Sequence, residues 1–396
     1  MVIKNYSEIT LKKGRELSLL RGHPWIFSGA LQFIKGQPEN GDVVLAKDSA
    51  GRSLGLGFFN KKTDICFRLL TRNVNNEIHS AFWNERIHAA YMLRKKIIHD
   101  GTNAYRLVNA EGDGFPGLVV DVYDDVLVIS ITTAGMERQK QNILEALLFH
   151  LKPTVIYEQS AGRSRNLEGL QDQKGIIYGS NPKSRVRVLE NGYRFDVDYI
   201  GGQKTGFFLD QRINREKLET LSKNMTVLNC FCYTGAFSVY AVAGGAKKVT
   251  SLDISKSTCT AATEHLRING FPAHNHPVIE ADVFDYLRNQ QDTFDLIILD
   301  PPAFAKARKD VGKASRGYKE INMQAIRHLN PGGILATFSC SNFIQEDLFF
   351  KIVQSAARDA QANLQLLERL EAGPDHPLAL GHDEGRYLKG LLVKKM

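Results

Sequence analysis

The stretch VLNCFCYTGAF at residues 227–237 decides the fold of the C-terminal half of this 396-residue chain. An apolar strand segment runs into a turn that contains one glycine and then into a helix-forming segment. Three more apolar segments follow, KKVTSLD (247–253), FDLIILD (294–300) and GGILATFS (332–339), with helical stretches between them. Short apolar strands that alternate with helices predict a parallel, doubly wound α/β sheet of the Rossmann-like kind, which binds ligands at the carboxyl ends of its strands.

The turn after the first strand predicts a cofactor without phosphates. Gly235 lets the backbone approach a ligand, and Tyr233 and Thr234 line the same turn. The pyrophosphate of NAD needs several glycines and an open helix N-terminus. This bulky turn has one glycine, which favours S-adenosylmethionine over NAD. An ordinary strand-to-helix turn is the alternative interpretation.

Carboxylates at the ends of the next two strands favour an adenosine group. Asp253 can accept both hydroxyls of a ribose, although it could cap a helix instead, as could Ser255. Asp282, followed by Val283, can accept the exocyclic amine of an adenine or can cap the next helix. Taken in this order and spacing, these residues predict an adenosine-containing cofactor.

Two segments near the C-terminus carry the candidate chemistry, LDPPAF (299–304) and TFSCS (337–341). A Cys340 thiolate that adds to C6 of a cytosine would make C5 nucleophilic, while Asp300 holds or protonates N3. A small buried cysteine is the alternative for Cys340. Pro301 and Pro302 stiffen the loop that would grip the base, and Phe304 offers a face for stacking.

The N-terminal segment 1–75 is basic and rich in short strands and glycine turns. It holds twelve Lys and Arg residues against six Asp and Glu, out of a net charge of +8 for the whole chain. Such a module suggests a polyanionic partner, with solubility as the alternative. Arg21 and Trp25 are candidate RNA contacts, although Trp25 or Phe27 could belong to the core of a small barrel.

The remaining patterns predict three domains. Residues 1–75 form a small β-rich domain that resembles the RNA-binding PUA domain, 76–185 a central mixed α/β domain, and 186–396 the Rossmann-like domain expected to bind S-adenosylmethionine. The central domain begins with an amphipathic helix over 76–100. A hairpin over 185–200, with its turn at Asn191-Gly192, opens the last domain.

Composition excludes several classes of protein. Five cysteines fit neither a disulfide framework nor a paired metal site, so no metal is expected. The sequence has no signal peptide and no segment apolar enough to span a membrane, which predicts a cytoplasmic protein.

The chain resembles the bacterial large-subunit ribosomal RNA methyltransferases that make 5-methylcytidine in 23S rRNA. The similarity extends over essentially the whole chain. It rests on the segments RGHPWIFSGA, RLVNAEGDGFPGLVVD, IYEQSAGRSRNLEGL, GGQKTGFFLDQR, VLNCFCYTGAFSV, LDPPAF, SRGYKEINMQAI and LATFSCS. The resemblance implies S-adenosylmethionine as methyl donor, Cys340 as nucleophile, 23S rRNA as substrate, and a homodimer.

Two of these segments add candidate site residues through the resemblance, and a third departs from the family pattern. GGQKTGFFLDQR places a set of residues beside the cofactor and the base: Gln203, Lys204, Phe207, Asp210 and Arg212. SRGYKEIN, with Arg316, Tyr318 and Lys319, closes over the RNA or caps a helix. LDPPAF departs from the general cytosine-C5 pattern, because Ala303 stands where a second cysteine is common, so another base must remove the C5 proton.

Two other functions remain open at this stage. A sister methyltransferase acting on guanine N7 or on an exocyclic amine would use the same cofactor but would not need Cys340. An RNA-binding ribosome assembly factor would use the PUA-like domain alone. Intact Asp253, Asp282, Asp300 and Cys340 argue against the second alternative.

Overall fold

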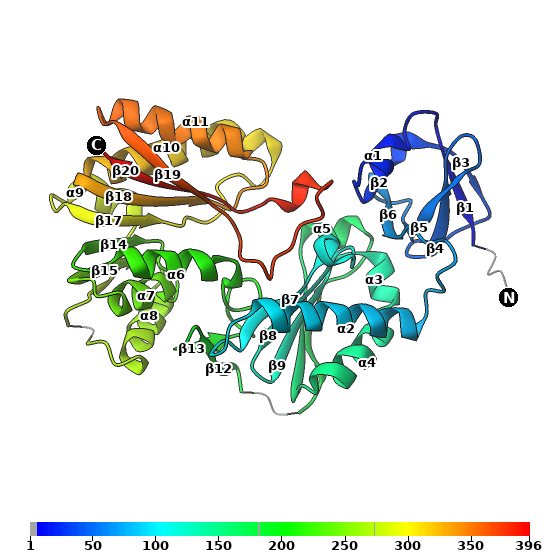
Figure 1. The fold of residues 1–396 in the computed structure, drawn as a ribbon, viewed down its shortest axis with the longest axis horizontal. Helices are drawn as coiled ribbons and strands as arrows, with labels where there is room; N and C mark the ends of the chain where they lie inside the picture. The colour runs from blue at the N-terminus through cyan, green and yellow to red at the C-terminus, as the bar shows by residue number, and fades with distance from the viewer. Residues whose placement is uncertain (1–5, 181–182, 273) are drawn as a thin grey trace. The chain divides into compact units, whose positions relative to one another are not determined.

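The computed structural model describes residues 6–180, 183–272 and 274–396 (Figure 1). The chain divides into two compact units. Unit 1 comprises Met1–Asn191, Val197–Leu209 and Pro374–Gly385, and unit 2 comprises Gly192–Asp196, Asp210–Gly373 and Arg386–Met396. Residues 1–5 of the predicted N-terminal domain lie outside the described residues. The division into three domains at residues 75 and 185 stays a prediction.

The first sheet of unit 1 confirms the short strands expected near the N-terminus. Within the described residues it has six strands in the order β2-β6-β5-β4-β1-β3, and β1 runs parallel to β4. The strands are β1 (Glu8–Leu11), β2 (Trp25–Phe27), β3 (Leu31–Lys35), β4 (Val43–Lys47), β5 (Ser53–Phe59) and β6 (Ile65–Thr71), with helix α1 (Leu17–Leu20) and the 3-10 turn η1 (Ser28–Ala30). Ile9, Val44 and Phe67 are fully buried in its core.

A second sheet of unit 1 has the order β11-β10-β9-β8-β7 within the described residues. Its strands are β7 (Ala104–Asn109), β8 (Leu118–Tyr123), β9 (Val126–Ile131), β10 (Val155–Ser160) and β11 (Gln173–Tyr178). The helices and turns are α2 (Ser80–Ile97), η2 (Ala110–Asp113), α3 (Ala134–Arg138), α4 (Lys140–Leu151) and α5 (Arg163–Leu167). Helix α2 confirms the amphipathic helix predicted over 76–100, because Phe82 and Ile87 are buried and basic residues occupy its last turn.

Some residues of the first sheet, such as Phe58, pack into the hydrophobic core of the second sheet. Phe58 of β5 stacks on Trp83 of α2, with ring centroids 6.3 Å apart. Gly135 of α3 packs so closely that a Cβ there would lie 2.0 Å from Phe58 Cγ. Residues on both sides of position 75 therefore stabilise each other by packing.

Two later segments of the chain complete unit 1. In Val197–Leu209, the Thr205 hydroxyl donates to Asp121 at 2.6 Å. In Pro374–Gly385, the Asp375 carboxylate accepts the backbone N–H of Arg106 at 3.0 Å. The carbonyl of Asp375 also accepts a hydrogen bond from the buried guanidinium of Arg94 at 2.8 Å. The sequence pattern did not predict either attachment.

Unit 2 contains the doubly wound sheet that the sequence predicts. Within the described residues its order is β16-β15-β14-β17-β18-β20-β19. The strands are β14 (Thr226–Cys230), β15 (Lys248–Asp253), β16 (Val278–Glu280), β17 (Phe294–Leu299), β18 (Leu329–Ser339), β19 (Leu364–Leu370) and β20 (Lys389–Lys395). The first five run parallel, and β20 is antiparallel to both neighbours. The strand order reverses between β14 and β17, which is where such sheets bind ligands.

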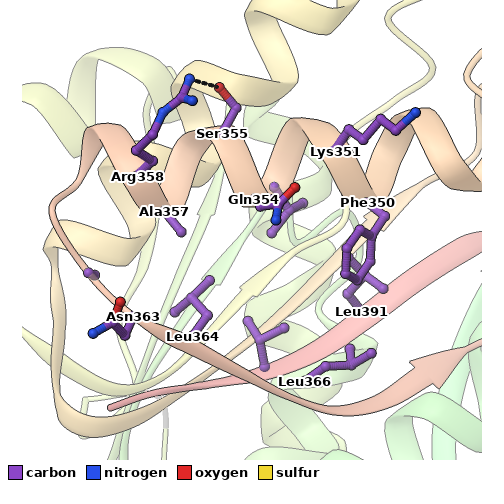
Figure 2. Close-up of a pocket in the computed structure, with 13 residues that line it drawn as sticks. Phe350, Lys351, Gln354, Ser355, Ala357, Arg358, Asn363, Leu364, Leu366 and Leu391 are labelled. Atoms are coloured by element: carbon purple, nitrogen blue, oxygen red, sulfur yellow. Dashed lines mark hydrogen bonds between the residues drawn. The ribbon is translucent and has the colours of Figure 1, made fainter.

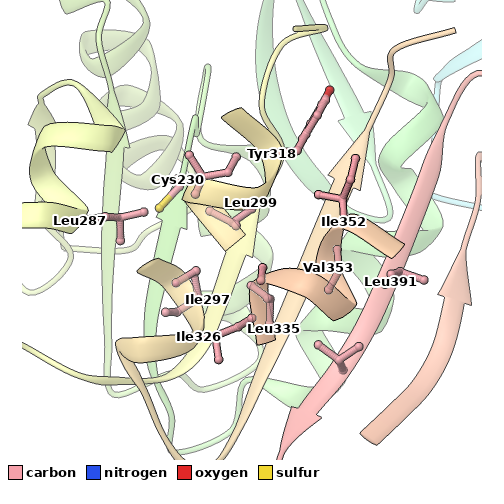
Figure 3. Close-up of a cluster of buried hydrophobic side chains, with 14 of the residues drawn as sticks. Cys230, Leu287, Ile297, Leu299, Tyr318, Ile326, Leu335, Ile352, Val353 and Leu391 are labelled. Carbon is pink, nitrogen blue, oxygen red and sulfur yellow. The ribbon is translucent and has the colours of Figure 1, made fainter. Parts of the chain in front are cut away.

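Helices cover both faces of this sheet (Figure 1). They are α6 (Arg212–Leu221), α7 (Ala236–Ala243), α8 (Lys256–Ile268), α9 (Val283–Asn289), α10 (Val311–Arg327) and α11 (Glu346–Asp359), with the turns η3 (Leu209–Gln211) and η4 (Arg308–Asp310). The turn η5 (Asp383–Gly385) belongs to unit 1. Figure 3 shows the core under α9, α10 and α11, where Ile297, Leu335 and Ile352 meet. The opposite core lies under α6 and α7 and includes Leu218 and Phe237. Apolar residues on both faces explain the continuous apolar strands.

The C-terminal strands of unit 2 differ from the sequence prediction. The antiparallel strands β19 and β20 were not expected. Strand β19 is an edge strand with five consecutive exposed residues, although four of its seven residues are leucine. The predicted hairpin over 185–200 is confirmed as β12 (Arg185–Glu190) and β13 (Tyr193–Asp198), with Asn191 and Gly192 at positive φ.

Candidate functional site

The turn between β14 and α7 is tightly wound. Phe231, Tyr233 and Gly235 have φ values of 58°, 49° and 75°, all in the left-handed region. A Cβ on Gly235 would lie 2.7 Å from the Cβ of Ala262 in α8. Glycine is therefore required here both for its backbone conformation and for close packing of α8.

Gly235→Ala is expected to destabilise unit 2 by roughly 2–4 kcal/mol, from left-handed backbone strain together with overpacking. Gly270→Ala is the matched control, because Gly270 has φ of 80° and nothing within 4 Å of its added Cβ. Urea denaturation of both variants measures the difference. Equal losses in the two variants would show that the contact with Ala262 contributes nothing.

Asp253 joins the ends of β14 and β15. Its Oδ2 accepts the backbone N–H of Tyr233 at 2.9 Å. Its Oδ1 accepts the N–H of Ser255 and the hydroxyl of Thr258, both at 3.0 Å. The carboxylate is half-buried and lies against the turn that contains Thr234. The structure thus brings Tyr233, Asp253 and Ser255 together.

Asp282 performs the capping role that the sequence left open. Its Oδ1 accepts the N–H groups of Phe284 at 2.8 Å and Asp285 at 3.1 Å at the start of α9. The side chain is exposed, whereas Val283 is buried in the core. Ser255 occupies the N-cap position of α8 without a capping bond from its side chain. Contact of these residues with a cofactor stays a prediction.

Asp300 follows β17 and is held by a glutamine that sequence reasoning passed over. Its Oδ2 accepts a hydrogen bond from Gln211 Nε2 at 3.1 Å. Gln211 in turn accepts from Asn214 Nδ2 at 2.6 Å. Both amides are buried, as is Arg212 beside them. The only sequence signal for Gln211 was its place inside the segment GGQKTGFFLDQR.

The loop after Asp300 packs into an aromatic cluster. Phe304 has its ring centroid 4.5 Å from that of Tyr318 in α10 and 6.0 Å from that of Phe284 in α9. Pro301 is buried and Pro302 is exposed. Tyr318 is fully buried, so it neither closes over RNA nor caps a helix. Instead, its ring packs against Phe304 of the loop. Arg316 is exposed on the same helix, and Lys319 pairs with Asp359 at 2.7 Å.

Cys340 differs from the other four cysteines of the chain, all of which lie in the described residues. It is partly exposed, and its Sγ lies 3.9 Å from the carbonyl oxygen of Pro301. The others are buried, and burial raises the pKa of each thiol: Cys66, Cys230, Cys232 and Cys259. Since the thiolate is the reactive form, Cys340 is the best placed nucleophile among them.

The turn that carries Cys340 is anchored on both sides. The hydroxyls of Tyr318 and Ser341 lie 3.1 Å apart, and the backbone N–H of Ala305 donates to Ser341 Oγ at 3.3 Å. Lys389 Nζ donates to the Ser341 carbonyl oxygen at 2.8 Å. The predicted catalytic carboxylate and thiol therefore follow adjacent parallel strands, β17 and β18, at the same edge of the sheet.

The contacts predicted in unit 1, to RNA and in the case of Gln203 to the cofactor, fall in two places. Arg21 is exposed next to β2, and Trp25 donates from Nε1 to Glu111 at 2.8 Å while its ring lies 4.3 Å from that of His382. The second place holds Gln203, Lys204 and Phe207. Gln203 and Lys204 are exposed, with the ammonium of Lys204 over the ring of Phe208, whereas Phe207 is 5% exposed. Their roles stay predictions.

A separate pocket of about 620 Å³ lies between α11 and strands β19 and β20 (Figure 2). It is lined by apolar side chains such as Phe350 and Leu364 and by Lys351 and Arg358. Its lining includes none of the predicted site residues in the described part of the chain. It is therefore distinct from the strand ends that carry Asp300 and Cys340.

The strand-end residues fit S-adenosylmethionine. Among the described residues, the buried hydroxyl oxygen of Thr234 is one that has no hydrogen-bond partner. A buried hydroxyl without a partner is unfavourable unless a ligand satisfies it. The Asp253 carboxylate beside it suits hydroxyl groups and would repel a phosphate.

A doubly wound sheet with this site, joined to a small N-terminal β-sheet, defines the class of cofactor-dependent transferases with an added binding domain. Residues 106–394 match the family model of S-adenosylmethionine-dependent methyltransferases, and residues 9–72 match that of the PUA-like domain. The chain belongs to the S-adenosylmethionine-dependent methyltransferase family, and S-adenosylmethionine is its methyl donor.

Full-length relatives and solved structures agree with this membership. The protein named "Ribosomal RNA large subunit methyltransferase I" from Pseudoalteromonas translucida is 42% identical over 98% of this chain and 99% of its own length. The protein of the same name from Shewanella denitrificans is also 42% identical, over 98% of each chain.

Two solved methyltransferases share the fold at 26% identity over 98% of this chain and 99% of theirs. One, from Streptococcus mutans, has a TM-score of 0.83, and the other, complexed with SAH, has a TM-score of 0.85.

Each helix in the described part of the chain is too short or too polar to span a bilayer. Over residues 6–180, 183–272 and 274–396, no group of three or more His, Cys, Asp or Glu side chains is arranged to hold a metal ion.

Proposed function

We propose that the protein methylates C5 of a cytosine in 23S ribosomal RNA through a covalent bond between Cys340 and C6. The observation that carries the proposal is the placement of Cys340, with its Sγ 3.9 Å from the Pro301 carbonyl oxygen, beside the loop that begins at Asp300. The names of the full-length relatives support ribosomal RNA as the substrate.

The cofactor residues act by binding and orientation. S-adenosylmethionine supplies the methyl group. Asp253 accepts the ribose hydroxyls, and the turn Tyr233-Thr234-Gly235 lies along the cofactor. Asp282 and Val283 border the adenine. Gln203, Arg212 and Asp300 complete the predicted cofactor contacts.

The side chains proposed to surround the target cytosine take part in the bond-forming and proton-transfer steps. The Cys340 thiolate adds to C6, forming an Sγ–C6 bond and placing electron density on C5 and N3. Protonated Asp300 stabilises that density by donating its proton to N3, and its carboxylate takes the proton back when the product forms. After C5 has formed its bond to the methyl group, a base removes the C5 proton. The C5–H electrons restore the C5=C6 bond, the Sγ–C6 bond breaks, and Cys340 leaves as thiolate.

The remaining residues would grip the RNA. Pro301, Pro302 and Phe304 hold the flipped base, since chemistry at C5 requires the base to leave its stack. Arg316 contacts the nearby backbone. Arg21, Trp25, Lys204 and Phe207 bind flanking RNA. This substrate implies a cytoplasmic protein, and we propose a homodimer, which sedimentation equilibrium would test.

Incubation with labelled S-adenosylmethionine and unmodified 23S rRNA is expected to give 5-methylcytidine, identified by mass spectrometry of the nucleosides. RNA that contains 5-fluorocytidine is expected to trap a protein–RNA adduct on Cys340, because fluorine at C5 cannot leave as a proton does. A methylated guanosine with no adduct would move the assignment to the sister enzyme. Binding of RNA without binding of S-adenosylmethionine would favour an assembly factor.

A further inference from the structure

A buried lysine lies directly behind the turn that carries Cys340. Lys389 begins β20, and in the antiparallel pairing with β18 it stands opposite Ser339. It is 7% exposed, and its Nζ donates to the carbonyl oxygen of Ser341 at 2.8 Å. Cys340 lies between these two residues in sequence. The ammonium is therefore held against the cysteine turn by a neutral acceptor.

A negative charge on Cys340 would favour the protonated form of Lys389. Burial lowers the pKa of Lys389 to about 8, and negative charges on Cys340 and Glu346 oppose that shift. A buried ammonium is unfavourable by itself, so a nearby anion is the natural means of stabilising it. At neutral pH a lysine with this pKa is still mostly protonated.

Three other titratable groups near the turn, Tyr318, Glu346 and Asp300, are not cations. Burial raises the pKa of Tyr318, whose hydroxyl faces Ser341, so it stays neutral. Glu346, in the first turn of α11, is paired with Arg369 of β19. Asp300 is an acid and not a cation, and its Oδ2 accepts a hydrogen bond from Gln211.

We propose that Lys389 is a positioning residue that keeps Cys340 ionised. Its ammonium, which the Ser341 carbonyl oxygen holds in place, is the counter-ion of the thiolate. This inference rests on the proposed function, because covalent attack on C6 is what gives the thiolate a use. It adds a residue that the strand-end pattern did not predict.

The pH dependence of alkylation tests this inference. Wild type and the variants Lys389→Met and Lys389→Arg are treated with iodoacetamide between pH 5 and 10, and mass spectrometry follows the peptide that contains Cys340. The wild-type midpoint is expected to lie about one to two pH units below the ordinary thiol value, with the Met variant near that value. The Arg variant is expected to keep most of the shift because it keeps the charge.

Lys395→Met is the matched control. Lys395 ends the same strand, and its Nζ donates to the carbonyl oxygens of Ile326 and Leu329 at 2.8 and 2.7 Å. Its removal should leave the Cys340 midpoint unchanged. Thermal melting identifies any variant that does not fold. The alkylation midpoint of the wild-type protein tests the inference even if a variant does not fold.

The possible outcomes separate this inference from the proposed function. An ordinary midpoint in wild type, or the same low midpoint in Lys389→Met, overturns the role of Lys389. If the midpoint is low and depends on Lys389 but the product is a methylated guanosine, the interaction between Lys389 and the Cys340 thiolate is supported. The covalent cytosine mechanism is then rejected.

Discussion

Replacing Cys340 with alanine is expected to reduce methyl transfer to 23S rRNA by at least about 10⁴-fold, the scale seen when a covalent nucleophile is removed. The physical reason is that C5 of cytosine is a poor nucleophile until a thiolate has added to C6. S-adenosylmethionine binding should persist, because Cys340 is not among the residues proposed to contact the cofactor. Single-turnover transfer of a labelled methyl group measures the rate, and calorimetry measures the binding.

Cys66→Ala is the control for this substitution. Cys66 is a buried cysteine in unit 1, and burial raises its thiol pKa to about 12. Its replacement removes a thiol without touching the turn at Cys340, so the rate should stay at the wild-type level. A Cys340→Ala enzyme that methylates at the native rate would exclude covalent catalysis.

The part of the site that depends on the sheet alone could be predicted from the positions of the strand ends. Residues that directly follow parallel strands must meet at one edge, so Asp253 and the turn with Tyr233 were expected to be neighbours, and they are hydrogen bonded. The same logic placed Asp300 and Cys340 after strands that prove adjacent.

The supporting residues could not be predicted because they come from distant parts of the chain. Gln211 is 89 residues from Asp300, and Lys389 is 48 residues from Ser341. Strand β20, which carries Lys389, inserts between β18 and β19 and runs antiparallel to them. No local pattern specifies that insertion.

One part of unit 1 could not be predicted for the same reason, because it comes from a distant part of the chain. The segment Pro374–Gly385 comes from within the predicted methyltransferase domain but packs in unit 1, with His382 against Trp25. Its sequence is short, polar and without periodicity, so it reads as a loop. Only tertiary contacts, such as that between Asp375 and Arg106, define its place.

Asp300→Asn is expected to lower kcat by about 10²–10⁴-fold, the usual contribution of a positioned acid or base. Asparagine preserves the size of the side chain but can neither carry the negative charge nor deliver a proton to N3. The dissociation constant for S-adenosylmethionine should change much less than kcat. Steady-state kinetics with 23S rRNA, together with calorimetry, separates the two effects.

Asp295→Asn is the matched control, because Asp295 lies at the opposite end of the same strand. Its carboxylate accepts from the N–H and hydroxyl of Thr226 at 2.8 and 2.9 Å, so its loss should reduce stability and leave kcat unchanged. Gln211→Ala tests how Asp300 is held. If the hydrogen bond orients the carboxylate, the double variant Gln211→Ala/Asp300→Asn should lose less activity than the product of the single losses. Strictly multiplicative losses would mean that Gln211 acts independently of Asp300, and a full-rate Asp300→Asn enzyme would remove the carboxylate from the chemistry.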